Sequence, residues 1–276
     1  MRGFLRSKRA RWSALGLLFL ALLALAAPWL APKDPDLIDL PRRLLGPGSG
    51  SWLGTDALGR DLAARMLYGA RISLGVGTLA VAMMTLIGIL MGTLAGHYRG
   101  WVDMVITRAI DILLCIPTFY LILALIVLLG PGIMNVVVVL ALTGWTETAR
   151  LVRAEVLSLR DREFILSARA AGASSSRVMF RHLIPNALGP VYVSAAFGVA
   201  GAILLETGLS FLGLGVQPPT SSWGNILEEG RQNISTAWWL TVFPGLAILV
   251  TMLLVNSLGE SVRRYFDSRS LDGRHG

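Results

Sequence analysis

The residues that most often carry enzyme chemistry are few in this sequence, and their spacing matches no catalytic pattern. The three histidines, His97, His182 and His275, lie far apart, and none belongs to an H-E-x-x-H pair. The stretch GLSFLG comes close to the G-x-S-x-G pattern of a nucleophilic serine, but Leu212 stands in place of the last glycine. We therefore expect no enzyme activity and no metal site in this chain.

A phosphate-binding loop is also missing from the sequence. Its two lysines, Lys8 and Lys33, do not follow the glycines of a G-x-x-x-x-G-K-[ST] loop, whose backbone would cradle the phosphates of a nucleotide. We expect no cofactor in this chain, and if its work uses ATP, the ATPase must be another protein. The single cysteine, Cys115, lies in an apolar stretch and has no second cysteine with which to form a disulfide within the chain.

The composition is typical of a membrane protein. Hydrophobic residues make up 54% and charged residues 15% of the 276 positions, whereas about a quarter of a soluble domain is charged. The first apolar stretch could be a secretory signal, because it follows basic residues and ends near ALAAPWLA, but we expect a retained helix. Six stretches approach the roughly 20 apolar residues that a membrane-spanning helix needs. These predicted spans are Trp12–Leu30, Ile72–Gly96, Val105–Leu129, Gly132–Ala149, Ala187–Leu205 and Trp238–Leu258.

Basic residues orient these spans. With the N-terminus inside, the inner segments hold 17 Lys and Arg residues and the outer segments hold 7. The positive-inside rule therefore places both termini in the cytoplasm, and the predicted fold is an all-α integral membrane protein with six transmembrane helices. The predicted segments are a basic N-terminus with the first span (1–31), an external loop with an interfacial helix (32–71), a core of five spans (72–262) that contains the cytoplasmic loop 150–186, and a cytoplasmic tail (263–276).

Ionisable residues inside the apolar stretches are costly there and are therefore functional candidates. Arg108 and Asp111 are three positions apart, as are Glu147 and Arg150, so each pair could neutralise itself on one helix face. Contact with a solute that crosses the membrane is the alternative role for Asp111 and Glu147. Glu206 has no evident partner nearby in the sequence, and we rank it first among the candidate residues of such a pathway.

The polar segment FILSARAAGASSSRVMFRHLIPN predicts two short helices at an angle. Within a helix over Glu155–Ala171, the side chains of Phe164, Ala168 and Ala171 share one face, and the alanines would let another surface approach closely. Gly172 fits the left-handed position that commonly ends a helix.

The second half of this segment begins with serines that could cap a helix. Ser174–Ser176 are N-cap candidates for a helix over Val178–Leu183, which Pro185 would end as the chain re-enters the membrane. A solvated loop whose arginines meet anionic lipid headgroups is the alternative interpretation.

The same segment resembles the EAA signature of binding-protein-dependent ABC importer permeases, in which Glu-Ala-Ala, three residues, Gly, nine residues and Ile-x-Leu-Pro recur. Ala168, Gly172 and Pro185 agree with the signature, and Ile184 is a conservative replacement, whereas other positions depart from it. The departing positions are Leu166, Ser167 and His182. The resemblance implies that a cytoplasmic ATPase receives this segment. The residues expected to couple to it are Phe164, Ala168, Ala171, Gly172, Ile184 and Pro185.

Two longer stretches resemble the C-type subunit of the dipeptide/oligopeptide/nickel permease family. They are WLGTDALGRDLAARMLYGARISLG (Trp52–Gly75) and LLETGLSFLGLGVQPPTSSWGNIL (Leu204–Leu227). The resemblance implies a type I ABC importer permease architecture in the bacterial or archaeal cytoplasmic (inner) membrane. It also implies a heterodimer with a sister permease, two subunits that bind ATP and Mg²⁺, and an extracytoplasmic solute-binding protein; no nucleic acid is expected.

The outer stretches contain the remaining candidates. Leu58, Leu62 and Met66 recur at i, i+4 and i+8, which predicts a helix in the membrane interface that anchors the second span; docking of the binding protein by this loop is the alternative. FLGLGVQPP cannot be a straight helix, and we interpret it as part of an outer gate, with simple loop packing as the alternative. We also expect Pro117 to kink the third span. The candidates are Asp56, Arg60 and Asp61 for docking and Gly213 and Gly215 for the gate.

Transport of short peptides is the favoured function, and transport of nickel or another small solute is the alternative within the same family. A secondary carrier that works without ATP is the alternative from another class. Carriers are commonly built from inverted repeats around a site at the membrane midplane. This sequence shows no repeat at a fixed period and no charged pair at a midplane, which disfavours a carrier.

Overall fold

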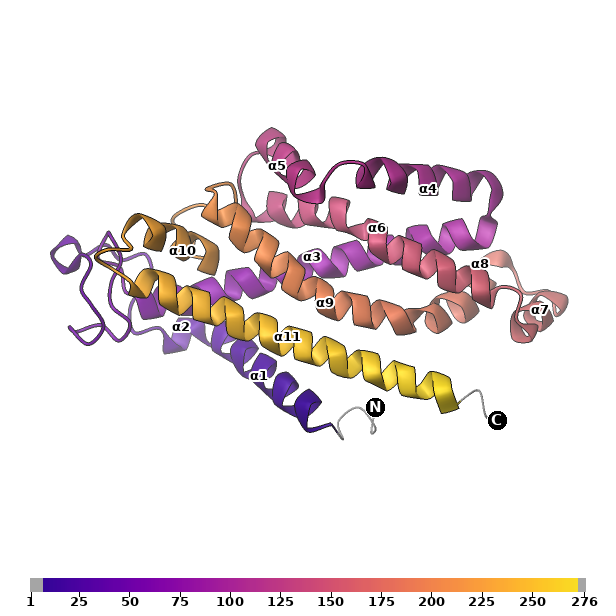
Figure 1. Cartoon of the computed structure of the whole chain (residues 1–276), viewed down its shortest axis with the longest axis horizontal. Coiled ribbons are helices and arrows are strands. Elements are labelled where there is room, and N and C mark those ends of the chain that lie inside the picture. Colours follow the sequence, from indigo (N-terminus) through magenta and orange to yellow (C-terminus); the bar gives the residue numbers. More distant parts are fainter. Residues whose placement is uncertain (1–6, 273–276) are drawn as a thin grey trace.

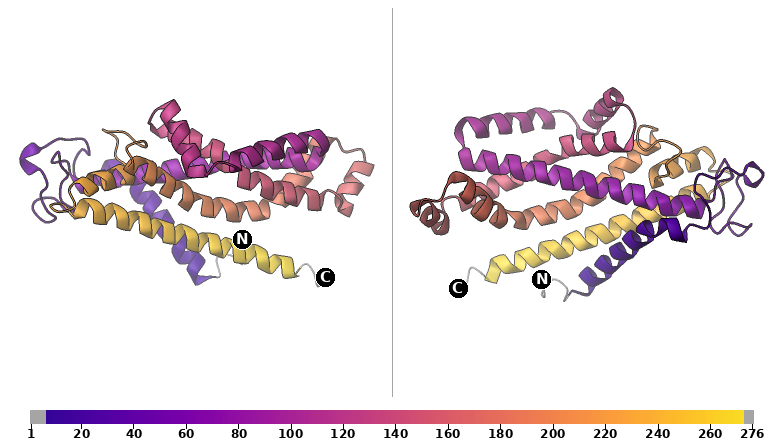
Figure 2. Two further views of the ribbon diagram at one scale, coloured as in Figure 1. Left: turned by 45° about the horizontal axis from the view of Figure 1, so that its top comes forward. Right: turned by 180° about the vertical axis from the view of Figure 1, so that it is seen from behind.

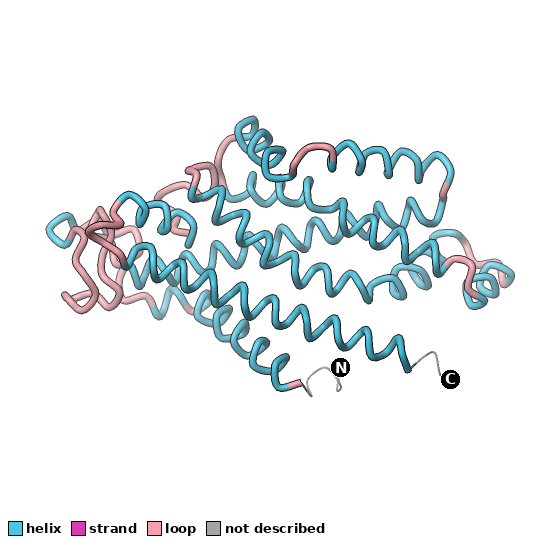
Figure 3. Tube along the Cα trace, in the orientation of Figure 1, coloured by secondary structure: helices cyan, strands magenta, loops and turns pink. Residues whose placement is uncertain are grey.

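The computed structural model describes residues 7–272, and this part of the chain is helical without a β-strand. The predicted all-α class is therefore confirmed for the described residues, whereas residues 1–6 and 273–276 of the predicted terminal segments lie outside them. Figures 1 and 3 show an elongated bundle with the long loop 31–61 at one end and α7 at the other. The helices are α1 (Lys8–Leu25), α2 (Ala27–Leu30), α3 (Leu62–Tyr98), α4 (Gly100–Leu114), α5 (Thr118–Leu129), α6 (Ile133–Leu159), α7 (Glu163–Ala170), α8 (Ser175–Val178), α9 (Ile184–Phe211), α10 (Trp223–Gln232) and α11 (Trp239–Asp272).

Three helical stretches are long and apolar enough to cross a membrane, and a fourth candidate is a bent pair. The three are α3, the continuous stretch Ser175–Phe211 that ends with α9, and Trp239–Phe266 of α11. The bent pair is α4 and α5, which meet at 90° next to Pro117, so the predicted bend of the third span is confirmed. The predicted spans in α1 and α6 fall outside this set because charged residues occupy part of each helix, and the count of six stays a prediction.

Three glycines on α3 bring this helix against α6. They are Gly88, Gly92 and Gly96, spaced four positions apart so that they share one helix face. A Cβ atom on Gly92 would lie 2.4 Å from the carbonyl oxygen of Ala149, so only glycine fits at this backbone separation. Small residues at this spacing are a common way to pack helices closely in membranes. We call these three residues the glycine seam.

The interior of the bundle lies between α3, α5, α6 and α9. Valine and leucine side chains of α6 fill it together with Ile122 and Ile126, which α5 inserts from the side of α6 that is opposite α11. Figure 2 shows α3 running nearly the full length of the bundle. α4 and α5 lie on one side of it, and α11 and the tilted α1 lie on the opposite side. All other described helices except α7 are thus placed against α3 or against a direct neighbour of α3.

The predicted interfacial helix does not exist as a separate element. α3 begins at Leu62 and continues into the span without a break, and the Asp61 carboxylate caps it by accepting the Ala64 N–H at 3.0 Å. Leu62 and Met66 pack against residues near the start of α11, so the apolar face that suggested a membrane interface is turned towards the protein. Leu58 lies in the turn before the helix.

A matched pair of glycine substitutions on α3 tests the glycine seam. Gly92→Ala places a methyl group against the α6 backbone, and an overpacked core typically costs about 1–3 kcal/mol. Gly75→Ala meets no atom within 4 Å and exchanges glycine for a better helix former. We expect Gly92→Ala to lower the melting temperature of the purified protein and Gly75→Ala to leave it unchanged or raised. Equal melting temperatures for the two variants would contradict the seam.

Candidate functional site

The segment after α6 forms two short helices joined at a left-handed glycine, as predicted. Gly172 has φ +79°, and the Ser174 hydroxyl caps α8 by accepting the Arg177 N–H at 3.4 Å. The prediction of one helix over Glu155–Ala171 was wrong, because α6 ends at Leu159 and α7 starts after a turn. α7 lies past the end of the bundle that is opposite α10, and α8 lies at that end (Figure 1).

Pro185 starts a helix instead of ending one. It lies in the first turn of α9, and the chain is helical from Ser175 through a π-helical turn (Met179–Leu183) to Phe211. A proline is tolerated in a first turn because its missing N–H has no intrahelical partner there. The predicted break at Pro185 is therefore corrected.

One buried side chain anchors the short helices and leaves most of the predicted coupling residues outside. Ile165 is buried with Val178 and Leu183 in a cluster that also contains residues of α6. Phe164 retains 44% of its surface, which is unusual for a large apolar side chain with an interior within reach. Ala171, Gly172 and Pro185 are also exposed, whereas Ala168 and Ile184 are half-buried.

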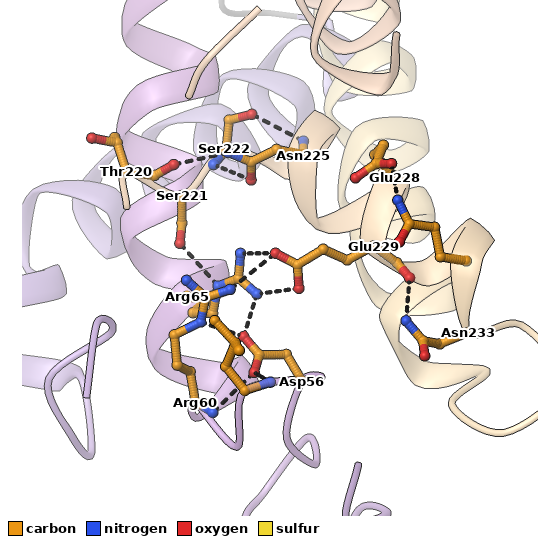
Figure 4. A network of polar contacts seen from close by, with 12 residues as sticks. Asp56, Arg60, Arg65, Thr220, Ser221, Ser222, Asn225, Glu228, Glu229 and Asn233 are labelled. Carbon is orange, nitrogen blue, oxygen red and sulfur yellow. Dashed lines mark hydrogen bonds and ion pairs between the residues drawn. The ribbon is translucent and has the colours of Figure 1, made fainter. Parts of the chain in front are cut away.

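At the opposite end of the bundle, two arginines and two carboxylates form a buried network (Figure 4). The Arg65 guanidinium, only 2% exposed, donates to both Glu229 oxygens at 2.7 and 2.8 Å and to the Ser221 hydroxyl at 3.0 Å. Arg60 donates to Asp56 at 2.6 Å and to Glu229 at 3.0 Å, and Arg65 also contacts Asp56. Two positive and two negative groups therefore balance, and the loop before α3 is fixed to α10.

The side chains predicted for docking are turned into the protein. Asp56 and Arg60 belong to the network just described, and the Asp61 carboxylate caps α3 and accepts the Ser51 hydroxyl at 2.6 Å. All three are buried, so a partner that docks at this end meets other residues of the loop first. Sequence spacing could not reveal this, because Glu229 follows Arg60 by 169 positions.

Glu206 is completely enclosed, contrary to the expectation that it lacks a partner. Its carboxylate accepts the Ser210 hydroxyl at 2.8 Å and the Ser73 hydroxyl at 3.1 Å. Each serine oxygen in turn accepts a backbone N–H, from Val216 and from Trp223. Glu206 thus connects α9, α3 and the chain between α9 and α10. The i, i+4 spacing of Glu206 and Ser210 is the sequence signal that could have revealed one of these partners.

The stretch after α9 is not helical, as predicted. Gly213 is exposed with φ +75°, a conformation that glycine adopts without strain. Gly215 is buried, and a Cβ atom on it would lie 2.6 Å from the backbone nitrogen of Ser210. The return of the chain onto the end of α9 therefore depends on both glycines.

Glu147 is exposed on α6 and lines three neighbouring cavities of about 630, 390 and 300 Å³. Ser194 and Gly198 of α9 line two of these cavities each, so the cavities follow the groove between α6 and α9. Asp111 is exposed on α4 and lines none of the three. We call this surface the α6–α9 groove.

The predicted ion pairs between neighbours on one helix do not form. Within residues 7–272, neither Arg108 with Asp111 nor Glu147 with Arg150 makes a salt bridge, and all four are exposed. The pair that forms instead joins α6 to α4: Arg153 donates to both Asp103 oxygens, at 2.5 and 2.7 Å. The i, i+3 spacing placed the predicted partners on one helix face, but it did not decide which side chains form ion pairs.

No cluster of three or more His, Cys, Asp or Glu side chains that could hold a metal occurs in the described part of the chain.

Sequence comparisons identify the family. The family described as "Binding-protein-dependent transport system inner membrane component" matches residues 88–271, and "N-terminal TM domain of oligopeptide transport permease C" matches residues 1–47. This chain belongs to the binding-protein-dependent transport permeases. The permease is a multi-pass membrane subunit, and permeases of this family work with a partner permease, ATPase subunits and a solute-binding protein.

Three relatives of the permease carry peptide-transport names. The dipeptide transport system permease protein DppC of Alkalihalophilus pseudofirmus is 39% identical, over 96% of this chain and 88% of the relative. The di/tripeptide permease DppC of Pseudomonas aeruginosa is 39% identical, over 97% and 90%. The dipeptide permease DppC of Bacillus subtilis is 39% identical, over 92% and 79%.

Solved ABC transporters share the fold of the permease. The inward-facing MetNI methionine ABC transporter matches with a TM-score of 0.61 at 17% identity, covering 74% of this chain and 97% of that chain. An amino acid ABC transporter matches with a TM-score of 0.53 at 14% identity, covering 75% and 94%. The architecture predicted from the resemblance, that of an ABC importer permease, is confirmed.

The buried network next to α10 supplies a stability test. Arg65→Gln leaves Glu229 and Asp56 short of a positive charge, and removing one partner of a buried ion pair typically costs about 3–5 kcal/mol. We expect the melting temperature of the purified permease to fall by about 6 °C or more. Arg264→Gln is the control, because its pair with Glu260 is exposed and such pairs contribute about 0–1 kcal/mol. A melting temperature for Arg65→Gln equal to that of the control would mean that the network does not stabilise the fold.

Proposed function

We propose that this permease forms half of a pathway for short peptides across the cytoplasmic (inner) membrane, within a binding-protein-dependent ABC importer. The peptide-transport names of its relatives support the substrate class. The observation that carries the proposal is the pair of short helices, joined at Gly172, that lies outside the bundle with Phe164 exposed. A segment held in a fixed shape but left uncovered is suited to a partner protein.

Two ATPase subunits bind ATP and Mg²⁺ in this proposal, and each receives such a segment, one from this permease and one from its sister. When ATP closes the two ATPases together, the segments move with them. Because α8 continues through the π-helical turn into α9, a movement of the segment is transmitted along a single helical path to the α6–α9 groove. The spans then change from inward-facing to outward-facing.

The solute crosses between the two permeases, and the α6–α9 groove of this chain forms one wall. Glu147 supplies a carboxylate in this groove, and every unmodified short peptide carries a positively charged N-terminal amine at neutral pH. The two charges attract each other in a site from which bulk water is partly excluded. Glu147 replaces Glu206 as the foremost candidate, since Glu206 is enclosed by hydrogen bonds.

The solute-binding protein docks at the opposite end, on the loop 31–61. This loop presents large apolar side chains to the outside, among them Leu37, Leu40 and Trp52. The buried network beneath holds the loop in place, so Asp56 and Arg60 support the docking surface without forming it. Gly213 and Gly215 shape the neighbouring chain that we assign to the outer gate.

Reconstitution tests the proposed function. The permease is purified with the subunits that accompany it, identified by mass spectrometry, and placed in proteoliposomes with the companion binding protein. We expect uptake of a labelled dipeptide that requires both ATP and the binding protein. Uptake of nickel or another small solute without peptide uptake would contradict the proposed substrate. Uptake without ATP would contradict the importer mechanism and favour a secondary carrier.

We call the two short helices α7 and α8, with Gly172 between them, the coupling segment. Two substitutions at Gly172 test its role. No atom lies within 4 Å of a Cβ at this position, so a side chain acts there through the left-handed backbone conformation alone. Asparagine tolerates that conformation and β-branched valine does not. We expect Gly172→Asn to retain most of the ATP-driven uptake and Gly172→Val to lose it while assembly persists. Equal uptake by both variants would show that the shape of the joint is not required.

Glu147→Gln tests the wall of the pathway. The substitution keeps the size of the side chain and removes its charge, so we expect the KM for dipeptide uptake to rise about tenfold, a loss of about 1.4 kcal/mol of attraction. Basal ATPase activity stays unchanged because the substitution alters no residue of α7 or α8. The exposed Asp111→Gln, at a position outside the groove, is the control. Uptake kinetics equal to those of the control would remove Glu147 from the pathway.

A further inference from the structure

A cavity of about 320 Å³ lies at the junction of the bundle and the short helices. His97 at the end of α3, Arg160 just after α6, Arg169 on α7 and Ser175 at the start of α8 all line it. The cavity thus brings together the two long helices of the glycine seam and both halves of the coupling segment. It is separate from the α6–α9 groove, with which it shares no lining residue.

Three nitrogen atoms that lie beside this cavity have no hydrogen-bond partner. Nδ1 of His97 is enclosed and makes no hydrogen bond, and the same holds for Nε and Nη1 of Arg160. The His97 side chain is buried, with 8% of its surface exposed. A buried donor left without an acceptor is unfavourable, and a buried guanidinium is more so because of its charge. The carboxylate nearest to Arg160 is that of Asp161, 3.4 Å from Nε, and its side chain is 73% exposed to solvent. The site therefore has more donors than acceptors.

Its charge is equally unbalanced. Arg160 and Arg169 carry permanent positive charges, and the His97 imidazole can donate from a protonated nitrogen. Of the described residues that line the cavity, none is acidic. The donors come from three separate elements, so they converge on the cavity from different directions. A tetrahedral group with three free oxygens can accept from all three at once, whereas a planar carboxylate offers two oxygens.

We propose that this cavity binds a phosphate group, which joins the ends of α3 and α6 to the coupling segment. The phosphate belongs either to an anionic phospholipid of the cytoplasmic leaflet or to a soluble phosphate compound; both present the same chemistry to the two arginines. Bound phosphate holds α7 and α8 at one angle to the bundle. Binding itself depends on these residues alone and not on the solute that the importer carries.

Binding is measured on the intact complex with two probes, inorganic phosphate and nanodiscs that contain phosphatidylglycerol in place of phosphatidylcholine. The variants are Arg160→Gln and Arg169→Gln, and the control is Arg177→Gln, an exposed arginine on α8 that does not line the cavity. Because Arg169 is exposed on a short surface helix, its variant tests the site even if Arg160→Gln fails to fold. The permease melting temperature and native mass spectrometry of bound lipid are the readouts.

We expect the wild-type complex and the Arg177→Gln control to bind one of the probes equally well, and Arg169→Gln to bind it at least tenfold more weakly. A response to inorganic phosphate identifies a soluble source, and phosphatidylglycerol adducts without that response identify the lipid. A probe effect that Arg169→Gln and Arg177→Gln change equally would overturn the proposal. It would also be overturned if neither probe bound while Arg169→Gln weakened ATPase association, because the occupant would then be an acidic side chain of the ATPase. Normal peptide uptake beside either outcome leaves the proposed function intact.

Discussion

The close contact of α3 with α6 is the constraint on which the other helices depend. α3 is 37 residues long and extends along nearly the whole bundle, and the glycine seam leaves no side chain at three of the positions where it meets α6. The backbones approach so closely that a single methyl group on Gly92 would collide with the carbonyl of Ala149. Because α5 and α9 pack into the interior beside this contact, a shift of α6 would displace the α6–α9 groove and the coupling segment together.

The two ends of the bundle are stabilised by different forces. The end that contains α10 is held by charge: Arg65 makes hydrogen bonds to three residues, and its positive charge is neutralised by Asp56 and Glu229. The opposite end is held by apolar packing of Ile165 with its neighbours, and Nδ1 of His97 and two nitrogens of Arg160 make no hydrogen bond there. Apolar contacts are non-directional and tolerate small rotations, whereas bidentate ion pairs do not. The end that contains α10 is therefore fixed by directional contacts, and the end that contains α7 is fixed by non-directional ones.

Local chemistry predicted the features that depend on neighbours in the sequence. The bend at Pro117 and the joint at Gly172 follow from the backbone limits of proline and glycine, and the long helices follow from apolar length. Partners at long range could not be predicted, as Ser73 precedes Glu206 by 133 positions. The apolar face that contains Leu62 was assigned to the membrane interface, because periodicity does not tell lipid from protein as the covering surface. The spacing of the glycine seam was visible in the sequence, but its partner helix was not.

The buried network next to α10 also imposes an order on biosynthesis. Ser221 and Glu229 follow Arg65 by 156 and 164 positions. A ribosome that adds about 5–20 residues per second needs roughly 8–33 s to make this stretch. During that time Arg65 has Asp56 beside it but not Glu229, and α10 cannot take its place until α9 has been inserted. The network is therefore completed only after α10 has been made, and Arg65 is without Glu229 in every chain whose synthesis has not reached that residue.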